Sequence, residues 1–206
     1  MNQLRTRVVA VDPSSPSSSA IADAAAVLEA GGVVAFPTET FYGLGVAALD
    51  AAAVRRLFAL KGRPESRPIL VLVDDPARVD RVALLTGAAR ELIARHWPGA
   101  LTLVLPARTS VPQELTAGTG TIGVRQSAHP VARALVAALG APVTAPSANL
   151  TGGPPPSSAQ EVLAVFDGRI DLILDGGPTP GGLPSTVLDV TVDPPRVLRE
   201  GAVRVW

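Results

Sequence analysis

Segments with the apolar periodicity of helices alternate with short apolar runs along most of this 206-residue chain. Apolar residues recur at helical spacing over 21–28, a glycine pair then stops the helix, and the apolar run 33–36 predicts a strand. The same alternation predicts helices after Asp50, at 88–96, from Pro130 and after Ser158, and strands at 69–73, 101–105, 121–125, around Val143, and at 170–174, 186–190 and 196–198. This alternation predicts an α/β fold. The last strands follow one another closely, which predicts antiparallel pairs among them and therefore a mixed sheet.

The length and composition of the chain favour one domain with a buried core. A single domain over 1–206 is expected, in which the Ser- and Pro-rich residues 1–16 form an irregular N-terminal lead-in. Hydrophobic residues make up 47% of the chain and charged residues 17%, a balance that excludes general disorder. Aromatic residues are only 3%, so a platform on which single-stranded nucleic-acid bases stack is disfavoured.

The charge and the residue usage exclude several other classes. Eighteen basic and eighteen acidic residues give zero formal charge, so no global field draws the protein to nucleic acid or to a membrane. With no Cys and two His, we expect no disulfide, no thiol catalysis and no protein metal site. No apolar run approaches the ~20 residues that span a bilayer and no signal-peptide pattern is visible, so we expect a cytoplasmic protein without membrane contact.

Three polar signatures lie where predicted strands or helices give way to loops. They are PTETFYGLG at 37–45, KGR at 61–63 and SAN at 147–149. Ammonium and guanidinium groups neutralise phosphate oxygens while Ser and Asn add oriented hydrogen bonds, so loops that bring these signatures together could hold a nucleotide. The chain has neither the Walker phosphate loop nor the dinucleotide-binding glycine fingerprint, so a nucleotide site here is of another design.

Further short motifs extend these signatures into a family resemblance. Together with GVR at 123–125, STVLD at 185–189, and Pro64, Pro68, Arg199 and Gly201, they resemble the YrdC family of threonylcarbamoyl-adenylate synthases. The resemblance implies a single YrdC-like domain with a twisted mixed sheet and flanking helices around a concave ligand cleft. It also implies a nucleotidyltransferase that converts L-threonine, bicarbonate and ATP to L-threonylcarbamoyladenylate and pyrophosphate, the first step of threonylcarbamoyladenosine (t6A) formation in transfer RNA.

The resemblance implies a set of residues for each substrate. Lys61 and Arg63 are the expected catalytic cations, because the threonine carbamate and the phosphates repel each other unless positive groups screen them. The residues expected on the ATP side are Lys61, Arg63, Arg67, Thr121, Ser147, Asn149, Pro155 and Arg199. The residues expected on the threonine side are Thr38, Thr40, Leu72, Arg125, Ala145 and Ser185. Arg125 is the natural carboxylate partner, because its planar fork can donate two hydrogen bonds.

Three positions depart from the family pattern. Arg67 stands where the family often has Asn, and Leu72 stands where it often has His. The change to Leu72 removes a polar group near the expected amino-acid pocket. Arg67 and Leu72 together motivate an alternative function, that of a paralogue with another carbamoyl or amine substrate. Ser127 replaces a Pro that is common after the GVR strand, a change expected to affect loop rigidity.

The resemblance also implies a metal ion and protein partners. Mg²⁺ is expected with the phosphates of ATP, and transferase proteins of transfer RNA modification are expected to take up the product. Glu39 would repel a triphosphate, so a structural or magnesium role is favoured over that of a general base. His96 and His129 are expected to end and begin helices rather than to take part in catalysis.

An alternative from a different class is a non-catalytic module that binds double-stranded RNA. The arginines of two predicted helices are most simply explained as solvated helix faces, but they could also form part of an RNA-facing rim that contacts transfer RNA directly; they are Arg55, Arg56, Arg90 and Arg95. The zero net charge counts against this alternative.

Overall fold

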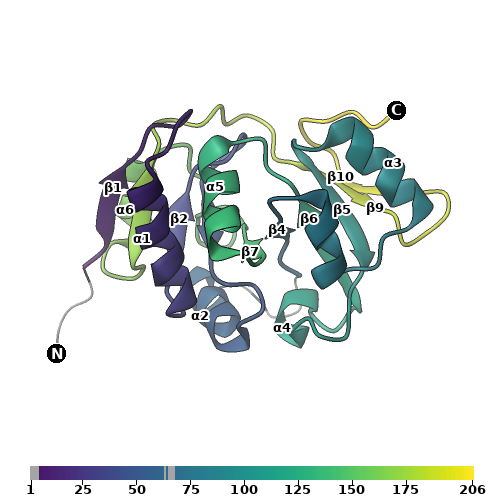
Figure 1. The fold of residues 1–206 in the computed structure, drawn as a ribbon, viewed down its shortest axis with the longest axis horizontal. Coiled ribbons are helices and arrows are strands. Elements are labelled where there is room, and N and C mark those ends of the chain that lie inside the picture. Colours follow the sequence, from purple (N-terminus) through teal and green to yellow (C-terminus); the bar gives the residue numbers. More distant parts are fainter. Residues whose placement is uncertain (1–4, 63, 65–67) are drawn as a thin grey trace.

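The computed structural model of the chain describes residues 5–62, 64 and 68–206. Within this part of the chain the strands form two sheets, one of four strands and one of six, and helices lie between and around them (Figure 1). The expected α/β class and the mixed pairing of strands are therefore confirmed, with the strands divided between two sheets. None of the helices in the described ranges has the length and apolar character needed to span a membrane.

The four-stranded sheet has the order β1 (Arg7–Ala10), β8 (Leu172–Asp175), β2 (Val34–Phe36) and β3 (Gly43–Gly45). β8 runs parallel to both β1 and β2, whereas β3 is antiparallel to β2. All of β2 and most of β8 are buried. Burial on both faces explains why their sequences are continuous apolar runs instead of alternating patterns.

The six-stranded sheet has the order β10 (Arg196–Arg199), β9 (Thr186–Asp189), β5 (Leu101–Pro106), β6 (Thr121–Arg125), β4 (Val71–Leu72) and β7 (Val143–Thr144). β5 and β9 are parallel, as are β4 and β6, and the remaining neighbours are antiparallel. The pairing of β10 with β9 shifts register between Val197 and Arg199. Such a bulge bends the strand and re-aims the side chains that follow it.

The two sheets meet where β3 and β7 lie side by side. The backbone N–H groups of Leu44 and Ala48 donate to carbonyls of residues 146 and 142 at 2.8 and 2.9 Å, and the N–H of Thr144 donates to Val46 at 3.1 Å. Isolated antiparallel bridges at Gly43 and Ala47 continue this pairing. The segment 42–48 therefore runs antiparallel to 142–148 and joins the edges of both sheets.

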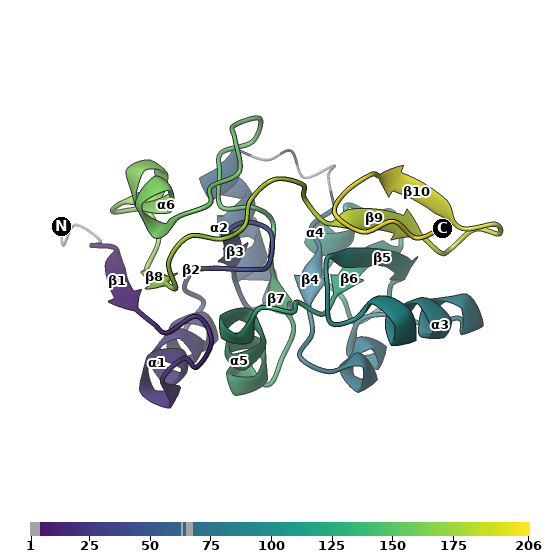
Figure 2. The same ribbon diagram turned by 90° about the horizontal axis from the view of Figure 1, so that it is seen from above.

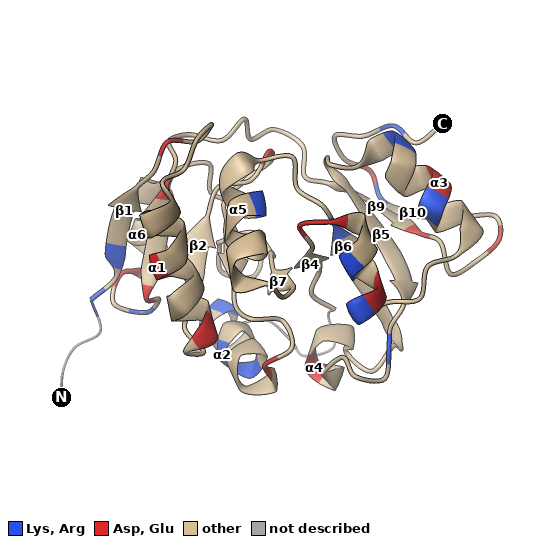
Figure 3. Cartoon of the chain, in the orientation of Figure 1, with Lys and Arg blue, Asp and Glu red and all other residues tan. Residues whose placement is uncertain are grey.

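The helices are α1 (Ser18–Glu29), α2 (Ala51–Lys61), α3 (Gly87–His96), α4 (Gln113–Thr116), α5 (Pro130–Leu139) and α6 (Ala159–Phe166), with a 3₁₀ turn η1 (Pro76–Arg81). Seen from above, α1, α5 and α3 lie along one side of the strands and α6 lies on the opposite side (Figure 2). Basic and acidic residues are interspersed over the described chain (Figure 3).

Local capping groups explain where the helices begin and end. Asp50 accepts hydrogen bonds from the first backbone N–H groups of α2, and Gly62 ends that helix in the left-handed region at φ 55°. Pro130 occupies the first turn of α5, and Nδ1 of His129 accepts from the N–H of Val131. These ends agree with the sequence predictions.

Two hydrophobic clusters form the core. The larger one contains Tyr42, Leu57 and Phe166 and follows strands of both sheets. The second contains Ile21 of α1 and Leu135 of α5, together with residues of β2 and β8, so it packs these two helices against the four-stranded sheet. Burial of these side chains is the main source of stability for the arrangement of helices and sheets.

Several local predictions were wrong or incomplete. Residues 7–10 of the expected irregular lead-in form β1, because they pair in parallel with β8 across more than 160 residues of sequence. The expected strand at 69–73 is confined to Val71–Leu72, and β3, α4 and η1 were not predicted. Glu161 completes the cap of α6 by accepting from the N–H of Ser157, one residue earlier than a standard capping box requires.

Candidate functional site

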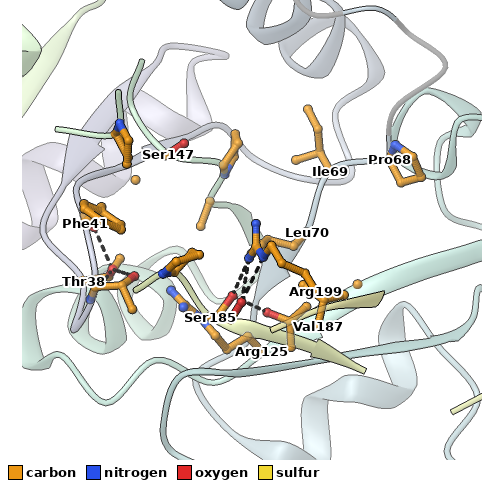
Figure 4. Close-up of a pocket in the computed structure, with 18 of the residues that line it drawn as sticks. Thr38, Phe41, Pro68, Ile69, Leu70, Arg125, Ser147, Ser185, Val187 and Arg199 are labelled. Carbon is orange, nitrogen blue, oxygen red and sulfur yellow. Dashed lines mark hydrogen bonds between the residues drawn. The ribbon is translucent and has the colours of Figure 1, made fainter. Parts of the chain in front are cut away.

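A cavity of about 660 Å³ opens over one face of the six-stranded sheet. Alternate residues of three neighbouring strands form its floor: Thr102 and Val104 of β5, Thr121, Gly123 and Arg125 of β6, and Val187 and Asp189 of β9. Because successive side chains of a strand point to opposite faces, this spacing of two places the cavity on one face. Its walls come from segments 38–43, 68–70, 145–149 and 182–185 (Figure 4). A cavity of this size suits a small-molecule ligand.

The junction of the two sheets brings two of the sequence signatures to the same wall. The N–H of Ala148 donates to the carbonyl of Tyr42 at 2.8 Å, and the N–H of Tyr42 donates to Pro156 at 3.0 Å. Gly45 permits this approach, because a Cβ there would lie 2.7 Å from Phe36 and 2.8 Å from Val143. The 37–45 and 147–149 signatures therefore meet through backbone pairing over about 100 residues of sequence.

Arg125 places a buried guanidinium at the end of β6. Its side chain is only 4% exposed, and its Nη1 lies 3.8 Å from Oε1 of Glu39. Its Nε is buried and has no hydrogen-bond partner among the described residues. Burial lowers the pKa of Arg125, and the negative charge of Glu39 opposes that shift. The guanidinium lines the cavity with hydrogen-bonding capacity to spare, which suits an anionic ligand.

Arg199 adds a second guanidinium on the same side of the cavity. Its Nε and Nη2 donate to the carbonyl of Ser185 at 3.1 and 2.8 Å, and Nη2 also lies 3.1 Å from the Ser185 hydroxyl (Figure 4). That hydroxyl in turn lies 3.0 Å from the hydroxyl of Thr102. Burial lowers the pKa of Arg199, and the nearby positive charge of Arg125 lowers it further. Two like charges held this close favour a negatively charged occupant.

The wall opposite Arg199 carries threonine hydroxyls. Thr38 Oγ1 donates to the carbonyl of Phe41 at 2.7 Å and lies 3.1 Å from Thr40 Oγ1. The carbonyl of Thr40 accepts from the N–H of Gly181 at 2.9 Å, which ties this loop to the segment leading into β9. Thr38, Thr40 and Ala145 all line the cavity, so this wall combines hydroxyl groups with a small apolar surface.

Lys61 fixes the 147–149 turn. Its Nζ donates to the carbonyls of Ser147 and Asn149 at 2.5 and 2.6 Å, and its side chain is buried. The backbone N–H of Thr151 donates back to the Lys61 carbonyl at 2.9 Å. The hydroxyl of Ser147 donates to Oδ1 of Asn149 at 2.5 Å, and both residues line the cavity whereas Lys61 does not. Lys61 therefore acts on the cavity through the shape of this turn.

The cavity brings together ten of the residues that the resemblance indicated. They are Thr38, Thr40, Thr121, Arg125, Ala145, Ser147, Asn149, Pro155, Ser185 and Arg199. Leu72 does not join them: it is fully buried and packs in the second hydrophobic cluster, because its side chain points to the face of β4 that the helices cover. Its expected place on the threonine side is therefore corrected. Arg63 and Arg67 lie outside the described residues.

Other lining residues were not predicted. Thr119 Oγ1 lies 2.9 Å from Thr121 Oγ1, and Thr102 holds the Ser185 hydroxyl. Asp189 supplies a carboxylate whose Oδ2 lies 3.6 Å from Nη2 of Arg196. The spacing of two along β5 places Thr102 and Val104 on the same face, but it does not tell which face lines the cavity.

The described residues do not form a protein metal centre. Within the described ranges no group of three or more His, Asp or Glu side chains is close enough to hold a metal ion, and the chain has no Cys. Asp189 lines the cavity and Glu39 lies beside Arg125, and each carboxylate is paired with an arginine.

The fold and the cavity define a class: an α/β protein whose cavity is lined by two guanidiniums and a set of hydroxyls. A family model named Sua5/yciO/yrdC, with the description "Telomere recombination", matches residues 26–201. The chain therefore belongs to the Sua5/YciO/YrdC family, as the sequence motifs indicated.

Individual relatives agree with this membership. The chain is 44% identical to threonylcarbamoyl-AMP synthase of Bacillus subtilis over 98% of this chain and 59% of that protein. It is 38% identical to a putative threonylcarbamoyl-AMP synthase of Mycobacterium tuberculosis over 90% of this chain and 86% of that protein. The crystal structure of Pyrococcus abyssi Sua5 complexed with L-threonine superposes with a TM-score of 0.92 at 43% identity, over 95% of this chain and 58% of that one. The chain thus spans somewhat more than half the length of two of these relatives.

Proposed function

We propose that this protein makes threonylcarbamoyl-adenylate and pyrophosphate from L-threonine, bicarbonate and ATP. The observation that carries the proposal is the buried, partly unsatisfied guanidinium of Arg125 in a cavity whose other walls hold the predicted ATP-side residues. The name of the Bacillus subtilis relative and the threonine complex of the Pyrococcus abyssi protein support the same reaction.

The threonine side of the proposed site lies around Arg125. Its guanidinium is suited to the amino-acid carboxylate, because a planar fork can form two parallel charge-assisted hydrogen bonds. The hydroxyls of Thr40 and Ser185 line the same cavity and can hydrogen-bond a small polar side chain. Since Leu72 is in the core, its departure from the family pattern gives no reason to prefer another amino acid.

The ATP side of the proposed site lies around the 147–149 turn. Ser147 and Asn149 offer hydrogen bonds from this turn, which Lys61 holds in place, and Thr121 and Pro155 complete the wall. Arg199 lines the same cavity, and in the proposal its charge screens the repulsion between a carbamate and a phosphate. Arg63 and Arg67 belong to the proposal on sequence grounds alone. Mg²⁺ enters it as part of the MgATP substrate, and no step is assigned to a protein-held metal.

Positioning and charge neutralisation carry the proposed reaction. The threonine amine first condenses with bicarbonate to a carbamate, forming the C–N bond and releasing water. A carbamate oxygen then attacks the α-phosphorus of ATP, the bond from that phosphorus to the oxygen bridging to the β-phosphate breaks, and pyrophosphate leaves. Cations that hold the two anions in line lower the barrier more than any proton transfer does. The adenylate would then pass to transferase proteins that modify transfer RNA, and such a role places the protein in the cytoplasm. Direct RNA binding is not favoured, because charged residues of both signs are interspersed along the described part of the chain (Figure 3).

The test is release of pyrophosphate by the purified protein with MgATP, adding threonine and bicarbonate singly and together. Release that requires both substrates supports the proposal, whereas release indifferent to threonine contradicts it. Arg125→Ala should raise the threonine Kd at least about tenfold with a smaller change for ATP, since it removes a charged hydrogen-bond donor. Arg55→Ala, at a half-exposed position on α2, is the matched control and should leave both affinities unchanged.

A further inference from the structure

A small group of charged and polar side chains lies next to Arg125 at the end of β6. Glu39 is 18% exposed and Arg125 is 4% exposed, so this ion pair is largely shielded from water. The hydroxyl of Ser127 donates a short hydrogen bond to Oε2 of Glu39. The backbone N–H of His129 donates to the same hydroxyl at 3.2 Å. Ser127 is therefore fixed from one side by the start of α5 and in turn fixes the Glu39 carboxylate.

The contact between the two charges is unusually loose for a buried pair. Glu39 Oε1 lies 3.8 Å from Arg125 Nη1, beyond hydrogen-bonding distance. Both Glu39 Oε1 and Arg125 Nε are buried and lack hydrogen-bond partners within the described ranges. An arginine that stabilised only the fold would be expected to use its donors on the available carboxylate. In this pair the Glu39 carboxylate attracts the Arg125 guanidinium but accepts no hydrogen bond from it, so the N–H donors of Arg125 stay unused by Glu39.

The positive charge of Arg199 raises the free-energy cost of holding the Arg125 guanidinium in the cavity. Arg199 is close enough to Arg125 for their like charges to interact unfavourably. The hydrogen bonds of Arg199 go to Ser185, which leaves Arg125 as the less restrained of the two. A fixed negative charge beside Arg125 opposes this repulsion and offsets part of the cost of burying the guanidinium.

We propose that Glu39, held by Ser127, is a positioning residue that keeps the Arg125 guanidinium in place with its donors free for the carboxylate of the amino-acid substrate. Glu39 is not among the described cavity-lining residues whereas Arg125 is, so it acts through Arg125 and not as a base on the substrate. The inference deepens the proposed function and rests on it. The inference also gives a role to Ser127, which stands where the family commonly has Pro: its hydroxyl holds the Glu39 carboxylate.

The test measures the Kd of L-threonine, of L-threoninol and of ATP by calorimetry. L-threoninol has no carboxylate, so it reports any general damage to the site. Glu39→Gln keeps an acceptor for Ser127 but removes the charge, and it should raise the threonine Kd at least about tenfold while the Kd values of threoninol and ATP stay within about twofold. Glu39→Asp restores the charge at greater distance and should give an intermediate threonine Kd.

Ser127→Ala supplies an independent variant, because it removes one hydroxyl and leaves the charges in place. It should weaken threonine binding less than Glu39→Gln does, and the double variant should be no worse than Glu39→Gln alone, since Ser127 acts through Glu39. Glu114→Gln breaks an ion pair with Arg55 on α2 and is the control for losing a salt bridge elsewhere.

The outcomes separate the inference from the proposed function. If the wild type binds threonine and requires it for pyrophosphate release, but Glu39→Gln binds threonine equally well, only the positioning role is overturned. Equal losses for threonine and threoninol would overturn it as well, because they indicate general disruption. A wild type that neither binds threonine nor turns it over would overturn the proposed function and the positioning role together.

Discussion

Lys61→Met removes the ammonium that joins the end of α2 to the 147–149 turn while keeping most of the apolar side chain. Two charge-assisted hydrogen bonds are lost, to the carbonyls of Ser147 and Asn149 at 2.5 and 2.6 Å. Each such bond contributes about 1.5–3 kcal/mol, and the released cost of burying the ammonium offsets part of the sum, so the free energy of unfolding should fall by about 2–4 kcal/mol.

The loss of stability should be accompanied by a loss of ATP affinity. Ser147 and Asn149 line the cavity, and their turn would no longer be tied to α2. Urea denaturation gives the free energy of unfolding, and calorimetry gives the ATP and threonine Kd values. The threonine Kd should change less than the ATP Kd, because the lost hydrogen bonds hold the 147–149 turn, whereas Arg125 ends β6 and Ser185 directly precedes β9.

Arg55→Met on the same helix is the matched control. Arg55 pairs with Glu114 but its side chain is 55% exposed, so its loss should cost less than about 1 kcal/mol. A Lys61→Met protein as stable as the wild type but with weakened ATP binding would refute the reasoning. That result would mean that Lys61 acts directly on ATP phosphates, as the sequence first suggested, and not by holding the turn.

Three further predictions concern the backbone, pH and a hydroxyl. Gly201→Ala should lower the melting temperature and weaken threonine binding, because a Cβ there would lie 2.3 Å from the carbonyl oxygen of Pro184, whereas Gly87→Ala meets nothing within 4 Å and should not. Burial lowers the pKa of His129 below its ordinary 6.5, so on acidification the unfolded chain binds a proton at a higher pH than the folded chain does. The free energy of unfolding should therefore fall as the pH drops below 6.5. Urea titrations at several pH values should show this fall, and it should be smaller in His129→Asn. Ser185→Ala removes a hydroxyl that contacts Arg199 and should weaken threonine binding several-fold in calorimetry, by about 1 kcal/mol, and unaltered affinity would contradict its assigned place.

Much of the fold could be predicted because its signals are local. The Asp50 cap, the glycine at 62 and the proline at 130 mark helix ends through their own backbone chemistry. β1 was missed because the pairing of a four-residue edge strand is decided by its partner β8, far away in the sequence. The division of strands into two sheets was not visible for the same reason.

The candidate site was predictable as a set of residues but not as an arrangement. The sequence motifs and the family resemblance named ten of the residues that line the cavity, although each motif also fits an ordinary turn or helix end by itself. Leu72 was misplaced because the face to which a strand residue points depends on register, and a shift of one residue reverses it. Thr102 was overlooked because nothing in the β5 sequence tells which face meets a ligand.

The sequence by itself determined the alternation of helices and strands, the family and most members of the site, since these depend on local chemistry and on short motifs. The tertiary structure decided that Lys61 holds a turn, that Glu39 and Ser127 support Arg125, and that the two signatures meet at the junction of β3 and β7. These are contacts between residues some 90 to 100 positions apart. Their distances, burial and charge balance exist only once the chain has folded, because no local preference encodes them.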